Sequence, residues 1–272
     1  MVKKLLKQEY KYYIRTFIFI LPAILLLGLS VRVIQFFEVN HFLYYLAFGG
    51  LLVMFFGGSA AVIIAAEVLA IVRFYKNMYS TEGYLTFTLP VTNHQHLISK
   101  LIAHVICSLT AVLAVLLSWI IAFVGTQGFS LVMAEFSSLF AEINFGPHIG
   151  HIIFFVLECI ILIVVSLFAS PLTYYSCISI GQLAKKNRIL LAIGVYYLYS
   201  VIVNVISTVF SMIVSIIGLA GNGFAWLALF IESHPFAFVH TMIWILIIIS
   251  AGLVALFYFI NIKIMNNKLN LE

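Results

Sequence analysis

The sequence predicts an all-α integral membrane protein with six transmembrane helices and both chain termini on the inner side of the membrane. Three observations predict this class. Of the 272 residues, 64% are hydrophobic and 8% are charged, whereas soluble domains average about 45–50% apolar and about 25% charged residues. The apolar residues gather in stretches long enough to cross roughly 30 Å of hydrocarbon. All but one of the 14 Lys and Arg residues can lie on one side of that arrangement.

The spans follow directly from the apolar stretches between polar connections. The first lies between Arg15 and Arg32, which is short for a bilayer, but arginines at helix ends can extend their charge to the interface. No small-x-small cleavage site follows the basic leader, so we interpret this stretch as a helix rather than a signal peptide. The expected spans are about 16–35, 42–72, 101–124, 150–177, 189–217 and 239–262.

The distribution of basic residues predicts the orientation. With the N-terminus inside, every Lys and Arg except Arg32 lies on the inner side, as the positive-inside rule requires. The opposite orientation would break this rule at each inner loop. The outer connections then carry Glu38, Glu135, Glu142 and Glu232.

Three connecting segments are expected to be more than turns. Residues 2–15 are predicted to form an amphipathic helix in the plane of the inner leaflet, or else a positive flank that only sets topology. Residues 125–150 are expected to hold an outer interfacial helix, and residues 218–240 a re-entrant or interfacial hairpin. The basic residues expected at the membrane surface are Lys4, Lys7, Lys11 and Arg15.

The inner connection over residues 73–100 has the most specific pattern. Ser80 or Thr81 can cap a short helix, and Glu82 would lie in its first turn, where the helix dipole favours an anion. Pro90 is expected to end that helix. Two long membrane helices would therefore hold a short, partly apolar helix in the cytoplasm, suited to dock in a groove of a soluble partner.

This connection resembles the ABC-2 family of ABC transporter permeases. In that family, E-G-x-L, a later P-V-S/T and then a Lys mark the coupling helix and the start of the third span. The resemblance is closest over residues 73–102, and Tyr84 and the Thr-Phe-Thr run before Leu89 depart from the pattern. The matching residues are Glu82, Gly83, Leu85, Pro90, Val91, Thr92 and Lys100.

The resemblance implies a single permease domain over residues 1–272, in the cell membrane of a bacterium. It also implies two copies of a cytoplasmic ABC ATPase, a second permease copy or a homologous permease, and export. The lipid bilayer is expected as a partner, and nucleic acid is not. The residues expected to couple to the ATPase are Tyr79, Glu82, Gly83, Tyr84, Leu85, Phe87, Leu89 and Pro90.

The sequence lacks nucleotide-binding and importer motifs, which agrees with an exporter whose ATPase is a separate chain. The sequence contains no G-x-x-x-x-G-K-[ST], so we expect this chain to be a transport subunit rather than an enzyme. It is expected to bind no cofactor and no metal itself, because ATP and Mg²⁺ would bind to the partner ATPase. The importer-type E-A-A loop signature is also missing. Few intramembrane charges favour an amphipathic or hydrophobic substrate, such as a peptide or lipid-like molecule.

Three charged residues are candidates for a cavity or gate: Glu67, Glu158 and Arg32. An unpaired charge near the bilayer centre costs about 2.5–3.5 kcal/mol on insertion scales, so each acid is expected to face protein or a watery cavity, or to be protonated. A structural pairing role is an open alternative, with Arg32 a geometrically possible partner for Glu158. The first, second and fifth spans are expected to line the cavity, with close helix approach at Gly49, Gly50, Gly57, Gly58 and Ser59.

Two other classes of function stay open at this stage. His148, His151 and Glu158 could supply ligands to zinc in an intramembrane enzyme, since catalytic zinc needs three protein ligands and an open position. However, neither H-E-x-x-H nor G-x-S-x-G occurs in the sequence. A passive channel is the remaining alternative.

Overall fold

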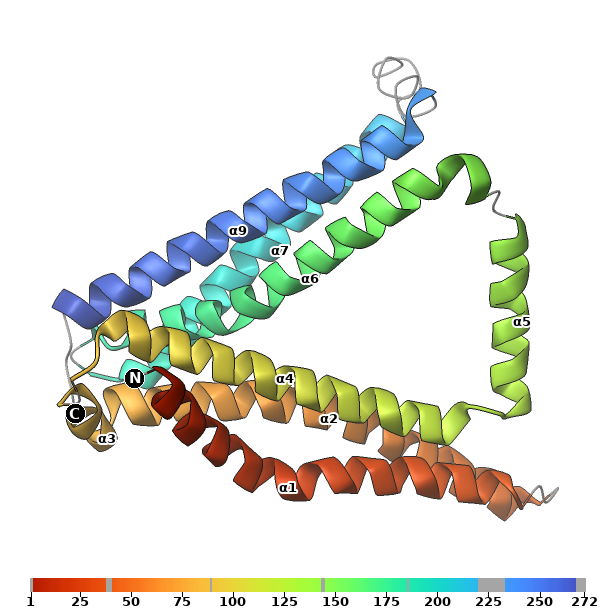
Figure 1. Cartoon of the computed structure of the whole chain (residues 1–272), viewed down its shortest axis with the longest axis horizontal. Helices are drawn as coiled ribbons and strands as arrows, with labels where there is room; N and C mark the ends of the chain where they lie inside the picture. The colour runs from red at the N-terminus through yellow and green to blue at the C-terminus, as the bar shows by residue number, and fades with distance from the viewer. Residues whose placement is uncertain are drawn as a thin grey trace. The chain divides into compact units, whose positions relative to one another are not determined.

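The computed structural model describes residues 2–37, 41–88, 90–142, 145–184, 186–219 and 233–267 (Figure 1). Within these ranges the regular elements are all helices, and six of them are long and apolar enough to cross a membrane. The all-α class is therefore confirmed, as is the presence of six helices with the length and composition of transmembrane spans. The helices are α1 (Val2–Gln35), α2 (Phe42–Tyr79), α3 (Thr81–Phe87), α4 (Asn93–Phe123), α5 (Gln127–Glu142), α6 (Phe145–Gly181), α7 (Arg188–Leu219) and α9 (Pro235–Asn267).

Most helices extend past the apolar stretches that predict them. The start of α4 is fixed by a capping box, in which Thr92 Oγ1 accepts from the backbone N–H of Gln95 and the Gln95 side chain accepts from the N–H of Thr92. The segments expected separately at 2–15 and 16–35 form one helix, α1, which changes direction along its length in Figure 1. Pro22 inside α1 accounts for the bend, because its ring removes a backbone donor.

The outer connections are described only in part. A helix, α5, lies within the predicted 125–150 connection. Most of the predicted hairpin at 218–240 lies outside the described residues, as do Glu38 and Glu232.

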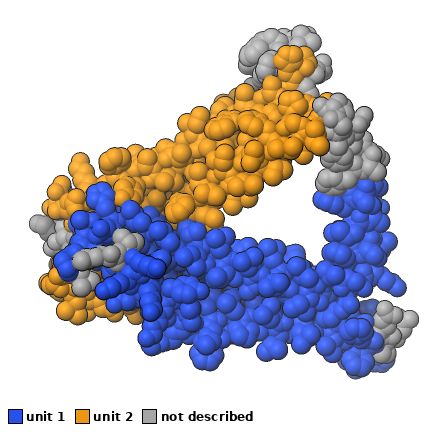
Figure 2. All heavy atoms as spheres, viewed as in Figure 1, with its two compact units in different colours: residues 1–74, 89–145 blue, residues 75–88, 146–272 orange. Residues whose placement is uncertain are grey.

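The chain divides into two compact units, which Figure 2 colours separately. Unit 1 comprises residues 1–74 and 89–145, and therefore contains α1, α4, α5 and most of α2. Unit 2 comprises residues 75–88 and 146–272, and contains the end of α2 together with α3, α6, α7 and α9. The short helix in the inner connection thus belongs to unit 2.

Unit 1 has a continuous apolar core along α1, α2 and α4. Its buried side chains recur at spacings of three, four and seven, as expected for one helix face. Small residues let α1 and α4 approach closely: a Cβ added to Gly28 would lie 2.6 Å from the carbonyl oxygen of Ser118. The core consists of Tyr13, Phe17, Ile24, Val31, Phe55, Val62, Ala66, Ala70, Ala103, Cys107, Ala111, Ala114, Val115 and Ala122.

Unit 2 buries side chains mainly near the C-terminal ends of α6 and α9. Leu172 and Tyr175 of α6 are 1% exposed, and Met78 at the end of α2 is fully buried. At the turn after α6, a Cβ added to Gly181 would lie 2.6 Å from the Cβ of Ala192 at the start of α7. The rest of α6, α7 and α9 is largely exposed within the chain.

Candidate functional site

The short helix α3 presents an aromatic and an aliphatic side chain outward. Tyr84 is 54% exposed and Leu85 is 74% exposed, while Gly83 and Thr86 are buried. Thr86 Oγ1 donates to the carbonyl oxygen of Glu82 at 3.0 Å, so the hydroxyl on the buried side is satisfied. Ser80 occupies the N-cap position without a side-chain cap bond, and the helix ends at Phe87. This helix therefore displays apolar groups on a surface that its own chain leaves uncovered.

The other residues expected to couple to an ATPase occupy different surroundings. Glu82 and Pro90 are exposed, and Phe87 is half-buried. Leu89 lies outside the described residues. Tyr79 is fully buried within unit 2, so its side chain faces the protein rather than a partner.

Tyr79 begins a chain of buried hydrogen bonds that joins three helices of unit 2. Its hydroxyl lies 2.7 Å from Ser179 Oγ on α6, which donates to Asn261 Oδ1 on α9 at 2.7 Å. Asn261 Nδ2 donates in turn to Ser176 Oγ at 2.7 Å and to the carbonyl oxygen of Phe257 at 2.9 Å. Tyr79, two residues before α3, is therefore bonded to α6 directly and to α9 through Ser179. This network was not predicted, because sequence spacing does not show which helices meet.

A buried carboxylate in unit 1 holds both ends of the inner connection. Glu9 of α1 accepts from Arg73 Nε at 2.9 Å and from Lys100 Nζ at 2.8 Å. The Arg73 guanidinium also lies 4.5 Å from the centre of the Tyr12 ring. Since Arg73 and Lys100 flank the connection, one carboxylate ties the C-terminal part of α2 to the N-terminal part of α4.

The position of Glu9 could have been found from the sequence. It is the only acid in a basic leader, and it precedes Tyr13 and Phe17 at spacings of four, which places it on the buried face of the helix. A charge on such a face requires a partner. On the opposite face the four predicted surface residues Lys4, Lys7, Lys11 and Arg15 are all exposed.

The three candidates for a cavity or gate have separate surroundings. Glu67 Oε1 lies 3.5 Å from His104 Nε2 on α4, so its neighbour is a histidine of unit 1. Glu158 is bonded to His240 on α9 within unit 2, with Oε2 2.7 Å from Nδ1. The guanidinium of Arg32 lies 5.2 Å from the centre of the Phe36 ring. Both histidine partners are distant in sequence from the acids, so their pairing was not predicted.

The glycines expected to allow close helix approach behave differently from one another. A Cβ added to Gly58 would lie 3.2 Å from Leu27 Cδ1 of α1, whereas one added to Gly49, Gly50 or Gly57 would meet no atom within 4 Å. Ser59 is buried and accepts from the indole N–H of Trp119 at 3.2 Å. Close approach within the chain is therefore found at the 58–59 pair.

A polar stripe on α7 adds to the expected cavity-lining helix. Hydroxyl and amide side chains recur every three or four residues, and all are exposed except Ser200, which is half-buried. Most of them bond within their own helix, as in the 2.8 Å bond from Asn204 Nδ2 to the Ser200 carbonyl. This spacing is visible in the sequence and could have identified the stripe. Its members are Ser200, Asn204, Ser207, Thr208, Ser211 and Ser215.

The histidines near the N-terminal ends of α6 and α9 include the residues of the alternative metal-site hypothesis. Across the described ranges, no group of three or more His, Cys, Asp or Glu side chains is placed to hold a metal ion. His148 and His151 instead lie against the ring of Phe236, at 4.7 and 4.6 Å between ring centres. Glu158 is turned toward His240.

Comparison of the chain with protein-family models, curated proteins and solved structures finds no match. The class of protein is defined by the structure alone: within the described residues the regular elements are helices, and six of them have transmembrane character.

Proposed function

We propose that this chain is the permease subunit of an ATP-driven ABC exporter of the ABC-2 type. The observation that carries the proposal is α3, a seven-residue helix between two long apolar helices. Its side chains Tyr84 and Leu85 are exposed and occupy the last two positions of the E-G-x-L pattern. The chain would span the cell membrane of a bacterium with both termini inside, and a separate cytoplasmic ATPase would bind ATP and Mg²⁺.

The exposed side chains of α3 suit a docking role. Binding energy at protein interfaces is concentrated in a few aromatic and aliphatic side chains that enter pockets. Tyr84 and Leu85 supply such groups, while Gly83 and Thr86 of the same helix are buried. A groove on the ATPase would receive the exposed pair.

The Tyr79 network offers a route from the docked helix into the membrane. A force on α3 reaches Tyr79, which is two residues before it, and through Ser179 and Asn261 it reaches α6 and α9. Buried hydrogen bonds of this kind resist separation, because a broken one leaves unsatisfied polar groups in an apolar setting. The three helices would therefore move together when the ATPase subunits close.

The uncovered surface of α7 suits a complex with a second permease copy. None of the most apolar stretch of α7 is buried within the chain, although the helix carries the polar stripe from Ser200 to Ser215. Polar side chains in membrane helices normally face protein or a water-filled cavity. The stripe would therefore line a translocation pathway shared by two permease copies. Its hydroxyl groups among apolar residues suit an amphipathic substrate.

The proposal is tested with the double variant Tyr84→Ala/Leu85→Ala. It should insert and fold normally, because both side chains are exposed, but it should lose copurification of the partner ABC ATPase. If docking persists, substrate-stimulated ATP hydrolysis in reconstituted complexes should be lost. The matched control is Leu131→Ala on α5, another exposed leucine, which should couple normally.

Two results would contradict the proposal. One is coupling of the double variant at the wild-type level. The other is substrate flux in liposomes that contain this chain alone and no ATP, which would indicate a passive channel instead.

A further inference from the structure

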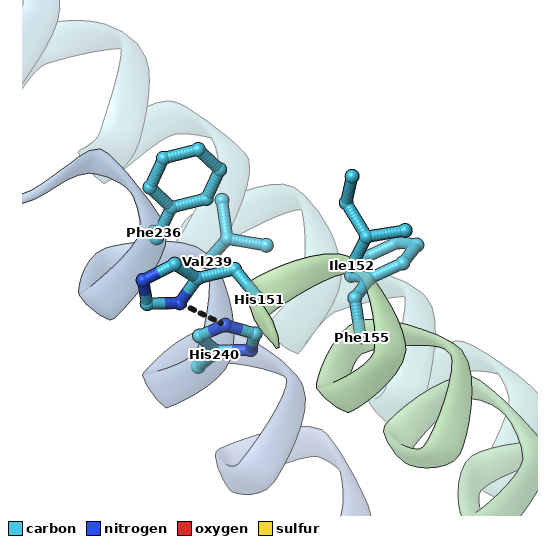
Figure 3. Close-up of a pocket in the computed structure, with 6 residues that line it drawn as sticks. All are labelled: His151, Ile152, Phe155, Phe236, Val239 and His240. Carbon is cyan, nitrogen blue, oxygen red and sulfur yellow. Dashed lines mark hydrogen bonds between the residues drawn. The ribbon is translucent and has the colours of Figure 1, made fainter. Parts of the chain in front are cut away.

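The N-terminal halves of α6 and α9 hold a chain of three titratable side chains that the proposed coupling helix does not use. His151 Nδ1 lies 3.3 Å from His240 Nε2, and His240 Nδ1 lies 2.7 Å from Glu158 Oε2 (Figure 3 shows the two imidazoles). Glu158 is seven residues after His151 on α6, so both lie on one face of that helix. We propose that these residues form a proton-transfer path that ends in a proton-binding site on Glu158.

The path runs from an exposed residue to a buried one. His151 is exposed, the side chain of His240 is 13% exposed, and that of Glu158 is 1% exposed. The two imidazoles line a pocket of about 190 Å³ whose other lining residues are apolar. The lining residues are His151, Ile152, Phe155, Phe236, Val239 and His240.

Aromatic packing fixes the two imidazoles in the positions that the path requires. The His151 ring stacks on Phe236, with 4.6 Å between ring centres and 9° between planes. The His240 ring lies 5.5 Å from that of His151, and Phe154 contacts it edge-on at 4.9 Å. Both nitrogen atoms of His240 therefore face a titratable partner, which is the arrangement that relays a proton.

The surroundings of the carboxyl group indicate that a proton is the ligand. Glu158 Oε1 is buried and has no hydrogen-bond partner within the part of the chain that the structure describes. A buried carboxylate oxygen without a donor is costly, whereas the carbonyl oxygen of a neutral carboxylic acid tolerates the same site better. Chains of Glu and His in membrane helices are typical of proton relays.

The transfer balances as three coupled shifts. Before it, Glu158 is ionised and accepts from His240 Nδ1–H, while His240 Nε2 accepts from His151 Nδ1–H. A hydronium ion gives a proton to His151 Nε2 and leaves as water. The Nδ1 proton of His151 then moves to His240 Nε2, and the Nδ1 proton of His240 moves to Glu158 Oε2. Both imidazoles stay neutral in the other tautomer, the hydrogen bonds persist with their directions reversed, and the carboxyl group becomes neutral.

Among the residues that the structure describes, few other titratable groups lie at this end of unit 2. On α6 they are His148 and Cys159, and on α9 the nearest is His234, which begins the turn into that helix. Residues 189–219 of α7 contain no acidic, basic or histidine residue. Glu158 is therefore the group whose charge changes most directly when the path is loaded.

The test uses the full-length protein in liposomes and does not depend on an ATPase. Infrared difference spectra between about pH 8 and about pH 5, the range in which imidazoles titrate, should show a carboxylic-acid C=O band in the wild type. Glu158→Gln should lose that band, while Glu135→Gln, which changes an exposed glutamate of α5, should keep it. After a rapid pH drop, His240→Phe should slow the appearance of the band.

Four results would overturn the proposal. The first is the absence of the band in the wild type, and the second is its persistence in Glu158→Gln. The third is an unchanged rate in His240→Phe. The fourth is stoichiometric zinc bound to the purified wild type and lost in His240→Phe, which would assign the histidines to a metal site.

Discussion

The two units of this protein differ in the interactions that stabilise each of them internally. In unit 1, 22–33% of the most apolar stretch of α1, α2 and α4 is buried within the chain, whereas in unit 2 only 0–6% of the corresponding stretch of α6, α7 and α9 is buried. Unit 1 thus has an apolar core together with an ionic lock, which consists of the ion pairs of Glu9 with Arg73 and Lys100. Unit 2 relies on a small core at one end and on buried polar bonds.

This difference in packing makes unit 1 suited to act as a scaffold and unit 2 suited to move. Helices that bury their faces against one another resist displacement, because separation exposes packed surface. The helices of unit 2 leave most of their surface for lipid or another chain, and the short helix α3 belongs with them. A docking event at α3 would therefore act first on the loosely packed unit. The following predictions test this contrast, from the largest expected effect to the smallest.

Glu9→Gln should have the largest effect on stability, and the effect should come from unit 1. The change leaves Arg73 and Lys100 beside a neutral group, and Lys100 is 3% exposed. Loss of one partner from a buried ion pair costs about 3–5 kcal/mol. Thermal unfolding in detergent should show a markedly lower Tm. The exposed Glu82→Gln serves as the control, and an equal loss of stability in that variant would refute the ionic lock.

Asn261→Leu should destabilise unit 2 by less and should impair coupling. The substitution removes both donors of the amide and leaves Ser176 and Ser179 without that partner, at a cost of about 1–3 kcal/mol. Ser137→Leu on α5 is the control, because Ser137 is exposed and bonds within α5 among the contacts described. The measurements are Tm and substrate-stimulated ATP hydrolysis. If both variants couple equally well, the Tyr79 network does not transmit force.

Glycine substitutions should locate the tight helix contacts in each unit. Gly28→Ala in unit 1 and Gly181→Ala in unit 2 would each place a Cβ within 3.0 Å of backbone atoms, and overpacking of this kind costs about 1–3 kcal/mol. Gly49→Ala would meet no atom within 4 Å and should stabilise its helix by up to about 1 kcal/mol. Unfolding midpoints of the three variants measure this contrast, and equal midpoints would contradict it.

The sequence predicted the elements of the fold better than their contacts. Composition and apolar stretch length identified the six membrane-type helices, because bilayer thickness and the need to satisfy backbone groups dictate both. Capping and proline signals indicated a short helix near 81–90. The boundary expected within α1 was not found, since an amphipathic leader and an apolar span share the same helical geometry and Pro22 only bends the helix.

The site contacts were less predictable because periodicity identifies a buried face but not the residue opposite it. Glu67 and Glu158 were recognised as costly charges, yet their neighbours His104 and His240 lie on other helices. Glu158 and His240 are 82 positions apart in the chain. The Tyr79 network could not be predicted at all, because nothing in the composition or spacing of Tyr79, Ser179 and Asn261 indicates that they meet.

The most direct test of the central claim is site-specific cross-linking from α3 to the ATPase. A photoreactive residue at position 85 should cross-link to the ABC ATPase in native membranes, and addition of ATP should change the yield. The same residue at position 138, which is exposed on α5 and assigned to the outer side, should give no such product. Cross-linking to the ATPase from position 138 but not from position 85 would contradict the assignment of α3 as the coupling helix.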